Sequence, residues 1–149
     1  MATGEEGDVG TVEDRLAIER QIYELGNKID NPDPEGWAAI FTDDGVADAT
    51  MLGMSEPFGY TKGSDELREF ARHTAERDMQ ELHHMTGVVF EELSADRART
   101  RSTILVTARW AKTPEPLVLT HGFYRDLWRK TPEGWRLAHR QFTKYGSRS

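Results

Sequence analysis

The hydrophobic pattern of the chain changes near Asp78, and this change constrains the fold more than any other feature. Before Asp78 the apolar residues recur at helical spacing, and after it they fall into runs rich in Val, Thr, Leu and aromatic residues. These runs span residues 82–93, 99–110, 117–128 and 135–145, with turn-forming residues between them. Helices followed by successive strands predict an α+β fold, with helices packed on one face of a curved, mostly antiparallel sheet.

The first predicted helix begins at a capping box, in which Thr11 stands three residues before Asp14. It ends near Asp30, because Asn31-Pro32 disfavours the helical backbone. Its apolar residues recur at helical spacing and define a buried face: Leu16, Ile18, Ile22, Leu25 and Ile29. A long amphipathic helix is therefore expected at the start of the fold.

Two further helices are expected before the main run of strands. The second follows Asp33 and Pro34, which are typical N-cap and first-turn residues. Its buried face would consist of Trp37, Ile40 and Phe41. Residues 43–45 (Asp-Asp-Gly) predict a turn, residues 46–52 a short strand, and Ser64 the start of the third helix.

Composition excludes several classes of site. The 149 residues fit one domain, expected over residues 11–145, with a flexible lead at 1–10 and a tail at 146–149. The absence of cysteine excludes disulfides and thiolate sites, and the net charge of −7 argues against nucleic-acid binding. The five histidines lack metal-ligand spacing, so no metal is expected. Without a signal peptide or a long apolar run, we expect a cytoplasmic protein with no membrane partner.

Two positions carry residue types suited to proton transfer. A carboxylate at Asp30 opposes the helix macrodipole, at a cost of roughly 0.3–1 kcal/mol, and a turn-forming role before Asn31-Pro32 is the simpler explanation. His83 and His84 open a predicted strand, and adjacent strand residues point to opposite faces. Alternation does not decide which histidine faces the helices. For the histidine that faces the helices, two roles remain open: a structural residue of the core, or a group that transfers protons near neutral pH.

Other side chains are candidates for cavity lining. Arg125 lies in an otherwise mostly apolar series on one strand face: Leu119, His121, Phe123, Arg125 and Leu127. An arginine there requires an ion-pair partner or a water-filled cavity. Two roles for Arg125 therefore remain open: a salt bridge to a neighbouring strand or subunit, or a charge that holds a substrate oxygen. Asp48 is either a solvated edge residue or an alternative base, with Tyr60 beyond it. Five apolar side chains serve as core or as cavity lining: Met51, Met54, Phe58, Trp110 and Phe123.

The order of these elements resembles the SnoaL-like branch of the nuclear transport factor 2 superfamily. The similarity rests on D-x-x-D-x-x-x-W-x-x-I-F over residues 30–41 and G-x-x-x-L-x-x-F over residues 63–70. It rests also on His-x-x-x-Gly over residues 83–87 and on a closing hairpin over residues 124–137. The resemblance covers residues 11–145, and its specificity lies in the order and spacing of the motifs.

This resemblance implies a cone-shaped α+β barrel, in which a curved sheet wraps around three helices and an apolar cavity. Scytalone dehydratase, bile acid dehydratase and hexachlorocyclohexane dehydrochlorinase pair an aspartate at the end of the first helix with a histidine on a central strand. Those positions fall on Asp30 and His83. The resemblance therefore favours His83 over His84, and it implies a homodimer or a homotrimer.

The chain also departs from these relatives. The tyrosine often found five residues before the aspartate is Leu25 here, and the second histidine of scytalone dehydratase is missing from residues 106–109. Asp48 lies one residue out of register with the base of ketosteroid isomerase. Because of these departures, the resemblance does not identify the substrate or the reaction. It bears more directly on the Asp30–His83 pair.

The resemblance and the residues together predict a cofactor-independent acid/base enzyme, a dehydratase-type lyase. Its substrate would be a hydrophobic, oxygenated small molecule such as a polyketide, a steroid or an aromatic compound. His83 is the expected base and Asp30 its partner; the expected substrate-binding residues are Tyr23, Met54, Phe58, Tyr60, Trp110, His121, Phe123 and Arg125. The alternatives are an isomerase or cyclase, a non-catalytic binding or oligomerisation module, and the small subunit of a ring-hydroxylating dioxygenase.

Overall fold

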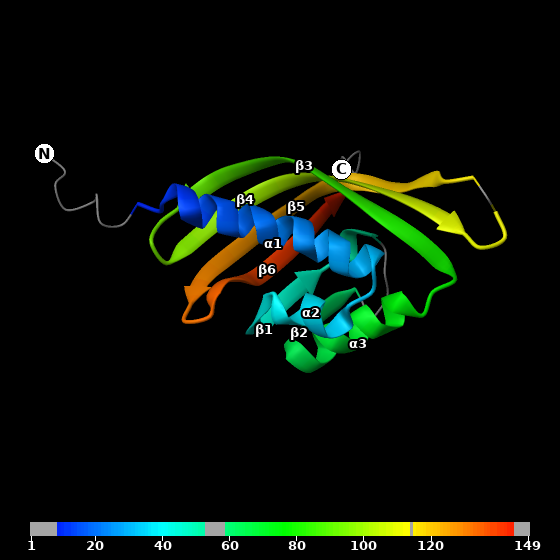
Figure 1. Cartoon of the computed structure of the whole chain (residues 1–149), viewed down its shortest axis with the longest axis horizontal. Coiled ribbons are helices and arrows are strands. Elements are labelled where there is room, and N and C mark those ends of the chain that lie inside the picture. The colour runs from blue at the N-terminus through cyan, green and yellow to red at the C-terminus, as the bar shows by residue number, and fades with distance from the viewer. Residues whose placement is uncertain (1–8, 53–58, 114, 145–149) are drawn as a thin grey trace, which may run out of the picture.

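Six strands form one curved sheet in the order β2-β1-β6-β5-β4-β3 (Figure 1). The strands are β1 (Phe41–Asp48), β2 (Tyr60–Lys62), β3 (Met79–Leu93), β4 (Arg97–Trp110), β5 (Leu117–Thr131) and β6 (Gly134–Lys144). Neighbouring strands are antiparallel except β1 and β6, which are parallel. The computed structural model describes residues 9–52, 59–113 and 115–144. Within them the sheet is open, with β2 and β3 at its edges.

Three helices cover one face of this sheet, which confirms the predicted α+β class. Helix α1 (Val12–Asp30) crosses the long strands and contacts β3 most extensively (Figure 1). Helices α2 (Pro34–Ala39) and α3 (Ser64–Ala75) pack against each other beside β1. The core lies between the two layers, and its largest buried side chains include Ile18, Leu25, Phe41, Leu67, Trp128 and Leu137.

The first helix follows the sequence prediction closely. The capping box of Thr11 and Asp14 is present in both directions, and α1 ends at Asp30. Ile18 and Ile22 of the predicted apolar face are fully buried, whereas Leu16 is exposed.

The segment after α2 differs from its prediction. The predicted turn at residues 43–45 lies inside β1, where the register against β6 shifts between Phe41 and Val46. Such a bulge inserts extra residues into a strand, so turn-forming Asp and Gly residues are accommodated without ending it. The predicted strand at 46–52 therefore begins earlier, at Phe41, and its last part is a 3-10 turn (Thr50–Leu52).

Gly87 lets β3 bend partway along its length. Its φ angle is 59°, in the left-handed region that favours glycine. The register of β3 against β4 shifts at this place, between Thr86 and Val89. A bulge with glycine in this conformation bends a strand and increases its twist, so the edge strand can curve over the helix.

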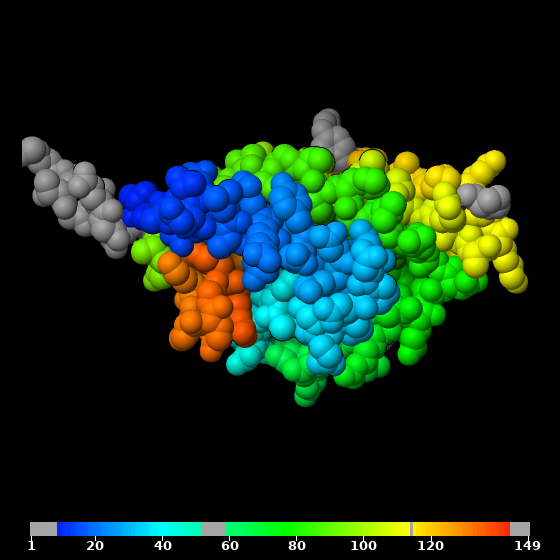
Figure 2. Space-filling view, viewed as in Figure 1, coloured from blue at the N-terminus to red at the C-terminus, as the bar shows by residue number. Residues whose placement is uncertain are grey.

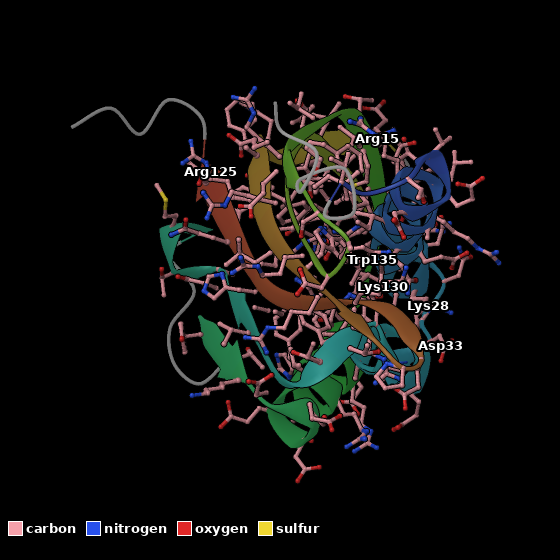
Figure 3. The ribbon with its side chains drawn as sticks, turned by 90° about the vertical axis from the view of Figure 1, so that its left-hand side faces the viewer. Arg15, Lys28, Asp33, Arg125, Lys130 and Trp135 are labelled. Atoms are coloured by element: carbon pink, nitrogen blue, oxygen red, sulfur yellow. The ribbon has the colours of Figure 1, made fainter. Side chains whose placement is uncertain are left out.

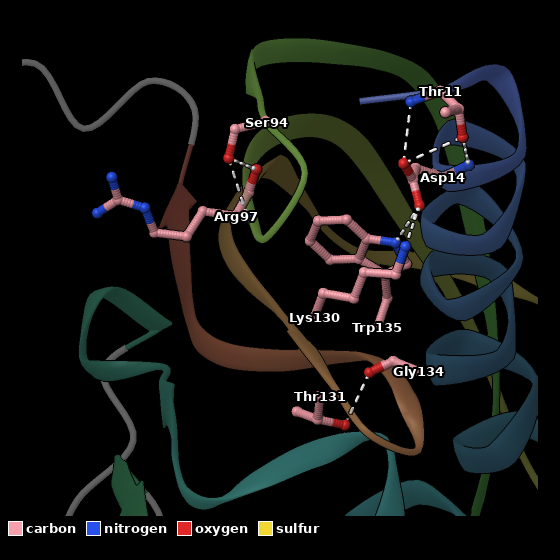
Figure 4. Close-up of polar contacts among 8 residues, drawn as sticks. All are labelled: Thr11, Asp14, Ser94, Arg97, Lys130, Thr131, Gly134 and Trp135. Carbon is pink, nitrogen blue, oxygen red and sulfur yellow. Dashed lines mark hydrogen bonds and ion pairs between the residues drawn. The ribbon is translucent and has the colours of Figure 1, made fainter. Parts of the chain in front are cut away.

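Asp14 ties the start of α1 to the turn between β5 and β6 (Figure 4). Its Oδ2 accepts hydrogen bonds from the backbone N–H and the hydroxyl of Thr11, at 2.9 and 3.0 Å. Its Oδ1 accepts from the Trp135 indole at 2.8 Å and from Lys130 Nζ at 3.1 Å. The β5–β6 turn accordingly lies against the first turns of α1 on the molecular surface (Figure 2).

These donors hold the pKa of Asp14 well below its usual range. The largest contribution is the Thr11 backbone N–H, followed by the Trp135 indole; burial opposes them, and Lys130 assists. Because the folded-state pKa is depressed, the ionised carboxylate stabilises the fold at neutral pH. That stabilisation begins to disappear as the pH falls below the usual pKa of an aspartate.

We predict that Asp14→Asn lowers the free energy of unfolding at neutral pH by about 1–3 kcal/mol, because the amide cannot accept all four hydrogen bonds. The difference from the wild-type protein should shrink in acid, because Asp14 of the unfolded wild-type chain takes up a proton there while the folded carboxylate stays ionised. Urea unfolding at neutral and at acidic pH measures both effects. Asp43→Asn, at an exposed carboxylate of β1, is the control. An equal loss in both variants, or a difference that grows in acid, would contradict the account.

Candidate active site

A cavity of about 390 Å³ lies between the helices and the inner face of the sheet. Apolar side chains from α1, α2, α3, β4 and β6 form much of its wall: Leu25, Ile29, Trp37, Phe70, Val106 and Phe142. Polar side chains reach the same space at a few places. A mostly apolar cavity with a small number of polar groups is typical of sites for small organic ligands.

His83 lines this cavity and is held by Asp30 through two contacts. The imidazole Nδ1 lies 2.6 Å from Asp30 Oδ1, and the backbone N–H of His83 donates to Oδ2 at 2.9 Å. Both side chains are largely buried, with exposed fractions of 11% for His83 and 7% for Asp30. The end of α1 and the start of β3 are therefore joined at the cavity wall.

Gly26 makes this approach possible. It lies one helical turn before Asp30 on α1, and a Cβ placed on it would lie 3.0 Å from the His83 Cβ. That distance is tighter than ordinary contact, so a larger residue would push β3 away from the helix. The small residue thus sets how closely the histidine approaches the carboxylate.

The geometry fixes which imidazole nitrogen carries the proton. An ionised carboxylate only accepts hydrogen bonds, so Nδ1 carries the hydrogen that faces Asp30 Oδ1. In the neutral ring Nε2 then has a free lone pair. Because the other carboxylate oxygen is bound by the His83 backbone, Asp30 cannot rotate without losing a second hydrogen bond.

Sequence reasoning missed Glu81, the second carboxylate beside this ring. Glu81 lines the same cavity, its Oε2 lies 3.8 Å from His83 Nε2, and its other oxygen forms an ion pair with Arg77. Its exposed fraction is 10%. Strand alternation could have found it, since Glu81 is two residues before His83 and so shares its face. Carboxylates on both sides of the ring stabilise a positive charge on it.

His84 points to the other face of the sheet. It is exposed, and its Nε2 lies 3.1 Å from the Thr107 hydroxyl. The choice that alternation left open is therefore decided by the geometry: His83, and not His84, lines the cavity.

The predicted inward face of β5 is wrong over residues 121–127, although Leu119 of the same series does line the cavity. Arg125 and His121 are exposed, Phe123 lies on the same outer face with Arg101 over its ring, and none of the three lines the cavity. Figure 3 shows Arg125 on the side of the molecule away from α1, whereas Lys130 and Trp135 lie beside the helix. The inner face instead carries Tyr124, Asp126 and Trp128. A buried aspartate on that face removed the hydrophobic signal that marks an inner face.

The other predicted residues have mixed outcomes. Tyr23, Tyr60 and Trp110 have exposed fractions of 44%, 41% and 37%, and they do not line the cavity. Asp48 does line it, but its Oδ1 accepts from the backbone and the hydroxyl of Thr50, as a turn-capping carboxylate does. Met54 and Phe58 lie outside the described residues.

Sequence reasoning also missed a second group of polar residues at the cavity wall, on β5 and β6. Arg140 of β6 binds Asp126 of β5 through two hydrogen bonds of 2.9 and 2.8 Å, and all four of their bonded atoms are buried. The guanidinium lies 3.9 Å from the centre of the Tyr124 ring. Tyr124 and Arg140 both line the cavity. A buried ion pair of this kind cannot be recognised from one sequence, because its partners are far apart in the chain.

Residues 9–52, 59–113 and 115–144 contain neither a candidate metal site nor a candidate membrane-spanning helix. No group of three or more His, Asp or Glu side chains there could hold a metal ion. No helix in this part of the chain has the length and the apolar composition needed to cross a membrane.

The family model described as a SnoaL-like domain matches residues 10–141. The chain belongs to the SnoaL-like family. This confirms the resemblance drawn from the motifs around Asp30 and His83.

Solved structures share the fold of this SnoaL-like chain. A Mycobacterium tuberculosis protein of unknown function is 28% identical, with a TM-score of 0.76, over 90% of this chain and 77% of that chain. A proposed aromatic ring hydroxylase from Novosphingobium aromaticivorans is 21% identical, with a TM-score of 0.80, over 91% and 92%. A proposed scytalone dehydratase from the same bacterium is 22% identical, with a TM-score of 0.74, over 93% and 91%. No curated protein sequence matches the chain.

We predict that the neutral His83 ring carries its proton on Nδ1 and that Asp30→Asn removes this preference. An asparagine side chain offers one acceptor, so it cannot serve both the ring and the backbone N–H of His83. Long-range ¹H–¹⁵N spectra of the imidazole nitrogens measure the tautomer. His84 provides the control in the same spectra, and its signals should not change. A wild-type ring protonated on Nε2 would contradict the geometry.

Proposed function

We propose that this SnoaL-like protein is a cofactor-independent acid/base enzyme, a dehydratase-type lyase that acts on a hydrophobic, oxygenated small molecule. One observation carries the proposal. The buried contact of 2.6 Å between Asp30 Oδ1 and His83 Nδ1 stands on the wall of a mostly apolar cavity. A histidine held this way offers Nε2 as a base, and the carboxylate stabilises the charged ring that forms.

In the proposed reaction, His83 Nε2 removes a proton from a carbon next to a carbonyl group. The C–H electron pair becomes the new carbon–carbon double bond as the hydroxyl on the next carbon leaves. His83 returns its proton to that hydroxyl, so the second product is water. Asp30 keeps its own charge throughout and holds the ring in place, as the carboxylate of a histidine–carboxylate pair does. General acid/base catalysis of this type contributes typically about 10²–10⁴-fold to the rate.

The cavity supports a ring compound as substrate. Its volume of about 390 Å³ lies near the lower end of small-molecule sites. Trp37, Phe70 and Phe142 give it flat apolar walls. Hydroxylated polyketides, steroids and aromatic carbonyl compounds combine such a ring with the acidic C–H that the base requires. An isomerase or a cyclase uses the same pair but returns the proton to carbon, and product analysis distinguishes these reactions.

We predict that His83→Gln lowers turnover by about 10²–10⁴-fold for any substrate found by screening hydroxylated polyketides, steroids and aromatic carbonyl compounds, because the glutamine amide is not basic enough to take up a proton at neutral pH. Asp30→Asn should lower the maximal rate with a smaller change in substrate affinity. A chromatographic assay of dehydrated product measures the rates. His84→Gln, one residue along on the outer face, is the matched control and should keep its activity. Equal activity of His83→Gln and the wild-type protein would remove this mechanism and leave a binding module.

We also propose that the protein forms a homodimer or a homotrimer through the outer face of its sheet, as the family resemblance implies. This face carries exposed apolar side chains from β3, β4 and β5: Leu82, Val89, Leu105 and Leu127. Leucine and valine on a long exposed sheet favour burial against a second surface.

We predict that Leu105→Arg converts the oligomer to a monomer, because a charge in the middle of an apolar contact must be desolvated. Sedimentation equilibrium measures the mass, and circular dichroism checks that the fold is retained. A wild-type protein that is already monomeric, or a variant with unchanged mass, would contradict the assignment of this face.

A further inference from the structure

Tyr124 brings a hydroxyl group into the same cavity as His83, and the mechanism above does not use it. The contacts that position Tyr124 are with the Phe142 ring and the Arg140 guanidinium beside it. Buried tyrosines ordinarily find a hydrogen-bond partner, and phenylalanine would otherwise fill the same space. A tyrosine on the wall of a mostly apolar cavity therefore offers its hydroxyl to a ligand that enters that cavity.

The ring of Tyr124 is held on two sides. Phe142 packs edge-on against it, with ring centres 5.8 Å apart. The Arg140 guanidinium lies 3.9 Å from the ring centre, and Arg140 is itself fixed by its two hydrogen bonds to Asp126. A donor positioned by packing and by a buried ion pair is preorganised, so little reorganisation is needed when a ligand binds.

The surroundings keep this hydroxyl protonated. Burial raises the pKa of Tyr124 most; Arg140 opposes part of that effect, and the charges of Asp126, Glu81 and Asp30 add to it, so the group is a donor at neutral pH. A carbonyl oxygen gains negative charge when a neighbouring carbon loses a proton, and a hydrogen bond from a positioned donor stabilises that charge.

His83 and Tyr124 reach the cavity from different parts of its wall. His83 pairs with Val106 of β4, and Tyr124 pairs with Ser102 of the same strand. The two groups are thus two strands apart and separated by four residues along β4. One planar ligand in the cavity contacts both when its oxygen and its acidic C–H lie on different parts of the ring system.

We propose that the Tyr124 hydroxyl donates a hydrogen bond to a carbonyl or phenolic oxygen of the ligand and selects ring compounds that carry one. The proposal rests on the proposed function in one respect: if His83 acts as the base, Tyr124 is the group that holds the substrate oxygen during the reaction. Arg140 is a positioning residue, since it acts on the ligand through Tyr124.

Binding of 4-methylphenol and of toluene to the protein tests the proposal without a substrate. Both probes are uncharged at neutral pH, and only 4-methylphenol carries an oxygen. We expect the wild-type protein to bind 4-methylphenol about tenfold more tightly than toluene, as one preorganised hydrogen bond allows. Tyr124→Phe should lose this preference and bind toluene as the wild-type protein does. Equilibrium dialysis in sealed cells measures the four dissociation constants.

Tyr23→Phe is the matched control, because it removes the same hydroxyl from a tyrosine on the exposed side of α1. It should keep the full preference. A wild-type protein with no preference, or a Tyr124→Phe variant that retains it, would overturn the proposal.

A second measurement does not depend on any variant. In wild-type protein labelled with ¹³Cζ-tyrosine, the Tyr124 resonance should shift further on saturation with 4-methylphenol than on saturation with toluene. A resonance that shifts no further with 4-methylphenol would overturn the assignment even if Tyr124→Phe folded poorly. Because neither experiment measures turnover, the Tyr124 assignment can fail while the His83 mechanism stands, and the reverse.

Discussion

The contact between Asp30 and His83 joins the end of α1 to the start of β3, and the candidate site depends on it. One carboxylate binds both the ring and the backbone of the same histidine, so it sets the tautomer of the ring as well as the distance between helix and strand. Gly26 allows the two elements to come this close, and the bend at Gly87 lets β3 continue over the helix. The same features that close the core on this side leave His83 Nε2 available to a ligand.

The part of the cavity wall formed by β5 and β6 depends on a different interaction. Asp126 and Arg140 form a buried ion pair, and breaking such a pair by removing one partner is strongly destabilising, because it leaves an uncompensated charge. Here the pair also holds the Tyr124 ring. The cavity thus has the His83 imidazole on β3 and the Tyr124 ring on β5, with apolar side chains over much of the rest of its wall. In the proposed function, a ring compound that bears an oxygen and an acidic C–H contacts both groups.

Local patterns in the sequence predicted much of the fold, because they report interactions between residues near one another in the chain. The capping box at Thr11 and the switch from helical to strand patterning correctly predicted α1 and the order of elements. The inner face of β5 could not be predicted in this way. Its Asp126 is buried only because Arg140 of β6 neutralises it, so apolar Leu127 wrongly marked the outer face as the inner one. Arg125 was chosen for that reason, and Tyr124, its neighbour, was missed. The choice of His83 over His84 required family resemblance, since alternation treats adjacent residues equally.

A double-mutant cycle with Asp30→Asn and His83→Gln tests the central contact most directly. Guanidinium unfolding of the wild-type protein, the two single variants and the double variant yields the coupling energy between the two side chains. The geometry predicts a coupling of about 1–3 kcal/mol, because each single variant leaves a buried polar group without its partner. Free-energy losses that simply add would show that the carboxylate and the imidazole do not interact, and would contradict the account of this site.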